Sequence, residues 1–298
     1  MPLENLAAGV IVPMITPFRV DRTVDLEAAD RLTRHVIAGR AAPFVLGTTG
    51  ESASISPKER KRLVEAAVRS AKKQMPVYAG ISSTSLSESQ QYARDYFRLG
   101  VDAVVAHMPA YYPLTKEYLY RYFSELADDL SGPLILYNIP TVTHQSLPVE
   151  VIDLLSHHSR IIAVKDSERD QGRLDHSLRL WSGRSDFKFL VGWGAMMAKG
   201  LMNGASGIVP STGNIIPDQY ADLYEAAVAE NGSLAEEIQK RTSEISEIYQ
   251  KGFSLGESLA ALKVILHAHD LCEQFMLPPL YRLDPEQEKK ILNEYKKL

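Results

Sequence analysis

A lysine ends a short apolar run in the middle of the chain, and its amine is the first candidate for chemistry. Residues 161–164 are Ile, Ile, Ala and Val, and Lys165 follows them directly. An apolar run of this length, bounded by polar residues, is typical of a strand buried on both faces. A lysine in such a strand pairs with an acid, extends its charged end to the surface, or uses its amine. Burial disfavours the charged form, and the neutral amine can attack a carbonyl carbon to form a Schiff base.

Two further polar groups at the ends of apolar runs fit the same chemistry. Thr48 and Thr49 lie between Gly47 and Gly50, and this pattern is either an ordinary turn or a small nest of backbone amides that can bind a carboxylate. Tyr137 is the last residue of another run and is either a core aromatic or a proton shuttle. Together with the lysine, these groups predict Schiff-base catalysis on a 2-keto acid.

The elements that must position these groups alternate regularly along the chain. We expect strands within residues 9–18, 43–47, 76–81, 101–107, 133–137, 161–165, 187–192 and 205–209. Amphipathic helices are expected at 25–39, from 56 onward, and at 85–99, 115–130, 148–157, 195–202 and 218–229. Eight strand-then-helix units predict a closed (β/α)8 TIM barrel, in which the carboxyl ends of the strands share one face. The loop at 13–17 lacks the glycine-rich fingerprint of a doubly wound nucleotide-binding sheet.

Local signals mark where some of these helices begin, and the pattern changes near the carboxyl end. Asp25 is expected to cap the first helix, and Ser56 with Glu59 predicts a capping box. Three helices without intervening strands are predicted at 234–249, 259–275 and 285–295. We therefore divide the chain into a barrel with the active site, residues 1–232, and a C-terminal helical extension, residues 233–298. Apolar positions of the extension, such as Ile245, Leu262 and Ile265, need to bury against either the outer helices of the barrel or another subunit. We expect this packing to contribute to a homo-oligomer.

Composition excludes several classes of protein. Hydrophobic residues make up 45% and charged residues 23% of the 298 residues, which is ordinary for a globular protein with a sizeable core. A net charge of -4 argues against nucleic-acid and membrane partners, and with no signal-like start the expected location is cytoplasmic. The single cysteine, Cys272, lies in an apolar helical pattern and is expected to be neither catalytic nor a ligand. No acid or histidine cluster has metal-ligand spacing, so no metal site is predicted.

Three motifs in this order resemble those of one family. They are Gly47-Thr-Thr-Gly-Glu51, Tyr137-Asn-Ile-Pro140 and Val164-Lys165-Asp-Ser167, and the stretch 204–215 adds a fourth match. Over essentially the whole chain, the sequence resembles the dihydrodipicolinate synthase and N-acetylneuraminate lyase family of class I pyruvate-dependent aldolases. The resemblance implies a TIM barrel, a homotetramer arranged as a dimer of dimers, and a covalent imine in place of any external cofactor.

The resemblance also implies roles for individual residues. Lys165 forms the imine with the keto carbon of pyruvate or a similar 2-keto acid, Tyr137 shuttles protons, and Thr49 relays them. Tyr111 or Tyr112 completes a hydroxyl chain with Thr49 across a subunit contact. The substrate-binding residues implied are Thr48, Thr49, Ser167, Gly192, Val209 through its carbonyl, and Ser211, which matches a hydroxyl contact of the sialic-acid lyases.

Departures from the family pattern concern the second substrate. Val142 stands where true dihydrodipicolinate synthases have the arginine that binds the aldehyde's carboxylate, and Glu168 and Arg169 replace a small residue and a glycine. His144 replaces a glycine of many relatives, and Arg169 or His144 is a candidate to bind a different acceptor. The acidic pair of the sialic-acid lyases is absent from Gly192-Trp-Gly194.

The expected function is therefore a Schiff-base-forming aldolase, lyase or dehydratase. Its substrate is expected to be a 2-keto-3-deoxy sugar acid or a related hydroxy-keto acid. One alternative is an authentic 4-hydroxy-tetrahydrodipicolinate synthase, which condenses pyruvate with aspartate semialdehyde and uses another residue for the missing arginine. A second alternative is a non-catalytic keto-acid-binding protein.

Overall fold

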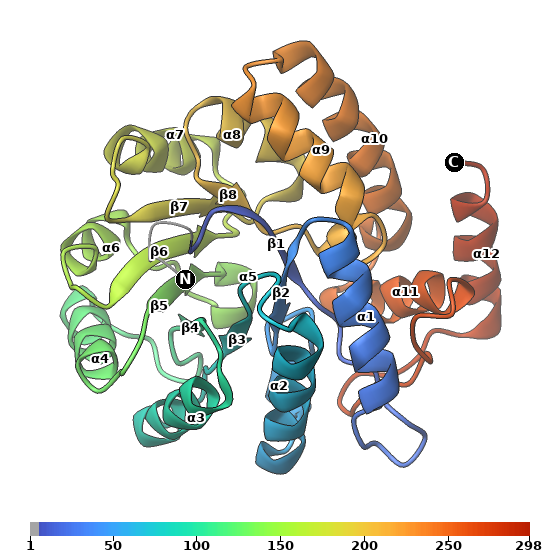
Figure 1. Ribbon diagram of the computed structural model, residues 1–298, viewed down its shortest axis with the longest axis horizontal. Coiled ribbons are helices and arrows are strands. Elements are labelled where there is room, and N and C mark those ends of the chain that lie inside the picture. Colours follow the sequence, from blue (N-terminus) through green and yellow to red (C-terminus); the bar gives the residue numbers. More distant parts are fainter. Residues whose placement is uncertain (1–5) are drawn as a thin grey trace.

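Eight parallel strands close into a barrel in the computed structural model, which describes residues 6–298 (Figure 1). Each strand pairs with the next, and β8 pairs with β1, so the sheet has no free edge. The prediction of a closed (β/α)8 barrel is confirmed. The strands are β1 Gly9–Pro13, β2 Ala42–Val45, β3 Tyr78–Gly80, β4 Ala103–His107, β5 Leu134–Asn138, β6 Ile161–Asp166, β7 Lys188–Val191 and β8 Gly207–Ile208.

Helices surround the strands as an outer ring (Figure 1). They are α1 Leu26–Ala38, α2 Pro57–Ala71, α3 Leu86–Leu99, α4 Lys116–Asp128, α6 Val149–Leu155, α7 Gln171–Trp181, α8 Met197–Met202 and α9 Pro217–Val228. Short turns of helix follow four strands: η2 Ser52–Ser54, α5 Pro140–Thr143, η3 Gly194–Met196 and η4 Ser211–Asn214. Sequence reasoning assigned no range to α7 and did not predict α5.

The helix starts show one confirmed and one wrong prediction. The side chain of Asp25 accepts the amides of Glu27 and Ala28, as expected of a cap. The hydroxyl of Ser56 accepts the Glu59 amide at 3.4 Å, but the reciprocal half of the expected capping box is missing. The Glu59 carboxylate accepts the Val24 amide at 2.8 Å instead and pairs with an arginine of its own helix. The Val24 amide, from a distant part of the chain, therefore replaces the Ser56 amide as the donor to Glu59.

Three helices follow the barrel: α10 Gly232–Gln250, α11 Leu255–Ala268 and α12 Pro285–Tyr295. The prediction of a helix over 259–275 was wrong at both ends. A capping box between Ser254 and Glu257 starts α11 earlier, and residues 269–284 are irregular, with Asp270 in the left-handed conformation and two prolines at 278 and 279. Cys272 therefore lies outside a helix, buried. The division at residue 232 stays a prediction.

Side chains alternate between two apolar layers along the strands. Along β5, Leu134 and Leu136 pack outward against the helices, whereas Ile135 and Tyr137 belong to the inner cluster that fills the barrel. The inner cluster also contains Ile11, Phe44, Tyr78, Val105 and Leu190. The inside of the barrel is thus a packed core. Among residues 6–298 no helix is long and apolar enough to cross a membrane.

Candidate active site

Lys165 and Tyr137 lie side by side on the inner face of the barrel. The two residues are register partners of β6 and β5, and each is only 5% exposed. The Lys165 amine lies 3.9 Å from the centroid of the Tyr137 ring and 5.6 Å from that of Phe44. Within the described part of the chain, no acid pairs with this amine. The amine therefore faces aromatic rings and open space, and the alternative of a lysine held in an ion pair does not describe this geometry.

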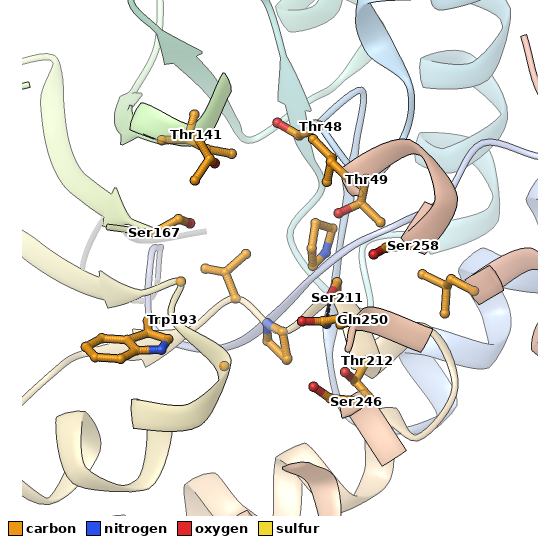
Figure 2. Close-up of a pocket in the computed structure, with 18 of the residues that line it drawn as sticks. Thr48, Thr49, Thr141, Ser167, Trp193, Ser211, Thr212, Ser246, Gln250 and Ser258 are labelled. Carbon is orange, nitrogen blue, oxygen red and sulfur yellow. Dashed lines mark hydrogen bonds between the residues drawn. The ribbon is translucent and has the colours of Figure 1, made fainter. Parts of the chain in front are cut away.

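A cavity of about 480 Å³ opens at the carboxyl ends of the strands (Figure 2). Lys165 and Tyr137 line it, as do six further residues to which the family resemblance gives a role in catalysis or substrate binding. The eight are Thr48, Thr49, Tyr137, Lys165, Ser167, Gly192, Val209 and Ser211. The topology thus brings together residues that are up to 163 positions apart in the sequence.

Tyr111 and Tyr112 do not line this cavity. They are 77% and 69% exposed, and their rings pack edge-to-face against each other at 4.9 Å. Their expected role requires a second subunit, so it stays a prediction.

The loop that carries Thr48 and Thr49 has an unusual backbone conformation. Leu46 before it and Glu51 after it both adopt left-handed angles, with φ of 60° and 54°. Such angles cost energy for residues other than glycine and persist where the surroundings impose them. The amides of Gly50 and Glu51 close the turn, whereas those of Thr48 and Thr49 form no hydrogen bond within residues 6–298. Two free amides and two hydroxyls are a suitable partner set for a carboxylate.

A buried ion pair fixes the end of this loop to helix α11. The Lys263 amine lies 2.5 Å from a carboxylate oxygen of Glu51, and both side chains are fully buried. The amine also donates to the Phe275 carbonyl at 2.8 Å, and Glu51 accepts the Leu277 amide at 3.0 Å. Burial lowers the pKa of Lys263, and the Glu51 carboxylate opposes that shift. The irregular segment after α11 and the loop after β2 are therefore held by one charge pair.

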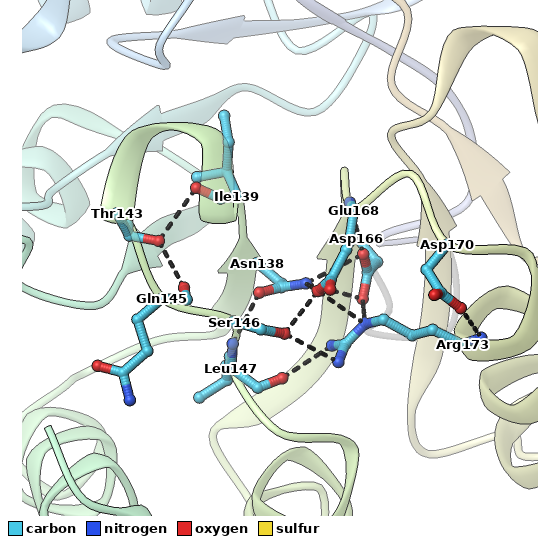
Figure 3. Close-up of polar contacts among 10 residues, drawn as sticks. All are labelled: Asn138, Ile139, Thr143, Gln145, Ser146, Leu147, Asp166, Glu168, Asp170 and Arg173. Atoms are coloured by element: carbon cyan, nitrogen blue, oxygen red, sulfur yellow. Dashed lines mark hydrogen bonds and ion pairs between the residues drawn. The ribbon is translucent and has the colours of Figure 1, made fainter. Parts of the chain in front are cut away.

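A second polar network anchors β5 and β6 behind the cavity (Figure 3). The Arg173 guanidinium lies 2.7 Å from Asp166 and 3.4 Å from Glu168. Asn138 donates to both carboxylates, at 3.1 Å and 2.9 Å, and Ser146 donates to Glu168 at 2.5 Å. Burial raises the pKa of Asp166, whereas the arginine opposes that shift. Because Asp166 directly follows the lysine, this network fixes the strand end from which the amine projects.

Gly192 allows the end of β7 to approach β6 closely. A Cβ atom at this position would lie 2.2 Å from the Ser167 hydroxyl oxygen and 2.8 Å from the Asp166 carbonyl oxygen. No side chain fits in that space. The nearby Val209 amide donates to the Val191 carbonyl at 2.9 Å. The carbonyl role expected of Val209 stays a prediction.

Helix α10 contributes polar groups to the cavity that sequence reasoning missed. The Tyr249 hydroxyl lies 2.8 Å from the hydroxyls of both Ser211 and Thr212, and the Gln250 amide donates to it at 2.9 Å. Burial raises the pKa of Tyr249, so its hydroxyl stays protonated near neutral pH. Ser246 and Gln250 reach the same wall (Figure 2). The helical period of α10 was visible in the sequence, but nothing local indicated which barrel loop it would contact.

Of the four positions that depart from the family pattern, Glu168 belongs to the network around Asp166, and the other three lie in different surroundings. Val142 packs against the inner apolar cluster and His144 is exposed in a left-handed turn, and neither lines the cavity. Arg169 does line it. Within the described chain, none of the cavity-lining residues is an aspartate or a glutamate, and no cluster of three histidine, cysteine or acidic residues could hold a metal ion.

Comparisons with known proteins agree with this arrangement. A model described as the dihydrodipicolinate synthetase family matches residues 6–298. The chain is 30% identical over 293 residues to the 4-hydroxy-tetrahydrodipicolinate synthase of Rickettsia akari, with 98% of this chain and 97% of that protein covered. It resembles the dihydrodipicolinate synthase structure from Bacteroides thetaiotaomicron with a TM-score of 0.93 at 32% identity, over 98% and 99% of the two chains. An Acinetobacter baumannii synthase complexed with pyruvate gives a TM-score of 0.90 at 25% identity, over 97% and 98%.

Proposed function

Because the chain belongs to the dihydrodipicolinate synthetase family and is a lyase of the class I aldolase type, we propose that Lys165 forms an imine with the keto carbon of pyruvate or a pyruvate-yielding 2-keto acid. The observation that carries this proposal is the buried amine without an acidic partner, facing the cavity beside a phenol. Attack of the amine on the carbonyl releases water and leaves a protonated imine. In an aldol cleavage, the imine accepts the electron pair of the carbon–carbon bond next to it, the hydroxyl on the departing carbon loses its proton and becomes a carbonyl, and an enamine results. In a dehydration, the imine accepts the electron pair of the carbon–hydrogen bond next to it as that proton is removed, and the resulting enamine expels the hydroxyl of the following carbon as water.

The other groups of the cavity have complementary roles in this proposal. Thr48 and Thr49 bind the carboxylate of the keto acid with their free amides and hydroxyls. Tyr137 moves protons to and from the reacting atoms. The covalent imine itself is the electron sink, so the mechanism requires no external cofactor.

The cavity wall supports a hydroxylated substrate tail. Six side-chain hydroxyls reach the wall and bond to no described residue: those of Thr48, Thr49, Thr141, Ser167, Ser246 and Ser258. A ligand with several hydroxyl groups can both donate to and accept from such a wall. We therefore propose a 2-keto-3-deoxy sugar acid or a related hydroxy-keto acid as the substrate.

Trapping with borohydride tests the proposed imine. Borohydride reduces an imine to a stable amine, so treatment with pyruvate should leave a pyruvyl adduct on the peptide that contains Lys165. Lys165→Ala should abolish the adduct. Release of pyruvate from a panel of hydroxylated 2-keto acids should then identify the substrate. An unmodified Lys165 after reduction would contradict the proposal, and Lys165→Ala with unchanged pyruvate affinity would favour a non-catalytic binding protein.

A second candidate is synthesis of 4-hydroxy-tetrahydrodipicolinate. The observations that favour it are the names of the relatives and the arginine in the cavity wall, since Arg169 could take over the carboxylate contact that Val142 cannot make. Coupled turnover of pyruvate with aspartate semialdehyde distinguishes the two functions. Rapid turnover with the semialdehyde and none with the hydroxylated acids would establish the second.

We also propose that the chain forms a homo-oligomer, a tetramer arranged as a dimer of dimers. The exposed, mutually packed rings of Tyr111 and Tyr112 would lie at the subunit contact and complete the hydroxyl chain with Thr49. Light scattering on the purified protein measures its mass. A monomer with full activity would contradict both the assembly and the role of the two tyrosines.

A further inference from the structure

Arg169 lies in the cavity wall on a backbone that is held on both sides. Glu168 before it accepts from Asn138 at 2.9 Å, and Asp170 after it caps helix α7 by accepting the Arg173 amide at 2.7 Å (Figure 3). The two acids next to Arg169 are thus committed to other partners. Its guanidinium is exposed and forms no ion pair with any residue of the described chain.

The charged side chains that line the cavity have one sign. Lys165 and Arg169 are the only charged residues among the described side chains that line the cavity. Arg173, the nearest other cation in the sequence, is neutralised by Asp166 and Glu168. A guanidinium that faces a cavity without acids is suited to bind a carboxylate supplied by a ligand, in a bidentate pair.

The barrel topology places two anion-binding groups at opposite sides of the same opening. Thr48 and Thr49 follow β2, whereas Arg169 follows β6, four strands away in a barrel of eight. Figure 2 shows Thr48 and Thr49 on one side of the cavity and Ser167, from the same loop as Arg169, on the other. Thr141, from the turn after β5, and Ser211, from the turn after β8, contribute further hydroxyls to the same cavity wall. A linear molecule with a carboxylate at each end and hydroxyls in the middle matches this set of groups.

From this arrangement, and on the basis of the function proposed above, we propose that Arg169 is a specificity-determining residue that binds a terminal carboxylate on the substrate tail. The preferred substrates are then dicarboxylic: a 2-keto-3-deoxy sugar diacid in place of the monoacid with a terminal hydroxymethyl group. Aspartate semialdehyde would bring a carboxylate to the same position, so the experiment includes it as a separate arm.

The test compares kcat/KM for two hydroxylated 2-keto acids that differ only in the terminal group. Wild type should favour the diacid. Arg169→Met should lower kcat/KM for the diacid about 10- to 100-fold, the loss expected for one charged hydrogen-bonded contact, and leave the value for the monoacid within about threefold. The matched control is Arg179→Met, which removes an exposed arginine of α7 that does not line the cavity, and it should behave as wild type.

Borohydride trapping of pyruvate on each variant separates this inference from the proposed function. If trapping is intact and Arg169→Met leaves the ratio of the two kcat/KM values unchanged, the role of Arg169 is refuted, whereas the imine mechanism stands. If wild type itself traps no pyruvate, the proposed function fails first. If only aspartate semialdehyde is turned over, and Arg169→Met lowers that turnover, the carboxylate contact is supported and the semialdehyde is its source.

Discussion

The buried pair of Glu51 and Lys263 offers the sharpest test of how the site is held. Lys263→Met keeps the length of the side chain but removes the charge and all three donors. The Glu51 carboxylate would retain only the Leu277 amide as a partner, and the Phe275 carbonyl would lose the amine that now lies 2.8 Å away. The Glu51 carboxylate cannot reach solvent, because its side chain is fully buried.

Breaking a pair of this kind costs about 3–5 kcal/mol, since it leaves an uncompensated charge in the interior. For a urea m-value of about 2–3 kcal/mol per M, the unfolding midpoint should fall by roughly 1–2 M. Loss of the pair also releases the loop that ends at Glu51. The concentration of pyruvate that half-saturates borohydride trapping should therefore rise, while trapping at saturating pyruvate remains. Urea unfolding followed by circular dichroism, and a pyruvate titration, measure the two effects.

Two further variants complete this experiment. Lys289→Met removes an exposed lysine of α12 that forms no ion pair in the described chain. Its urea unfolding midpoint should equal that of wild type. Adding Glu51→Gln to Lys263→Met should restore part of the loss, because the neutral amide leaves no uncompensated charge and can still accept from the Leu277 amide. If Lys263→Met has the wild-type midpoint, the pair does not stabilise the fold and the reasoning is refuted.

Three further outcomes are expected. Gly192→Ala should weaken borohydride trapping, because its Cβ would lie 2.8 Å from the Asp166 carbonyl oxygen and displace the backbone next to Lys165, whereas Gly194→Ala, with no atom within 4 Å of its Cβ, should trap like wild type; equal behaviour of the two would contradict the close approach. Arg173→Met should lower the urea unfolding midpoint about as much as Lys263→Met does, because Asp166 and Glu168 lose their cation. An unchanged midpoint would count against the network. Burial raises the pKa of Cys272 to about 12, so a thiol reagent at pH 7.5 should react only after unfolding; rapid reaction of the native protein would show that the thiol is accessible.

The sequence predicted those parts of the fold that depend on local pattern. Apolar runs of strand length gave all eight strands, and their alternation with helices gave the closed barrel. Because strand ends in such a barrel share one face, Tyr137 and Lys165 could be expected to meet, and the register of β5 and β6 places them side by side. The periodicity of side chains along a strand is fixed by its geometry, so it can be read without knowing the partners.

The sequence did not predict contacts between distant segments. Glu51 and Lys263 are 212 positions apart. The apolar run at 259–266 marks Lys263 as buried, but nothing in that run identifies its partner. The helix expected at 259–275 ends earlier, because the irregular segment after Ala268 brings backbone groups to that pair. The same holds for Tyr249, whose hydroxyl bonds reach back to the loop after β8. Such partners depend on how α10 and α11 pack on the barrel, which no local propensity determines.

The origin of the cavity wall in two parts of the chain affects how this enzyme can change over evolution. The groups assigned to imine formation come from residues 48–165, whereas Ser246, Gln250 and Ser258 come from helices α10 and α11. A substitution in either helix can therefore alter which tail is accepted without touching the amine or the phenol. Mutational drift in this carboxyl-terminal segment would diversify substrates among descendants of one ancestral gene, while the covalent step is inherited unaltered.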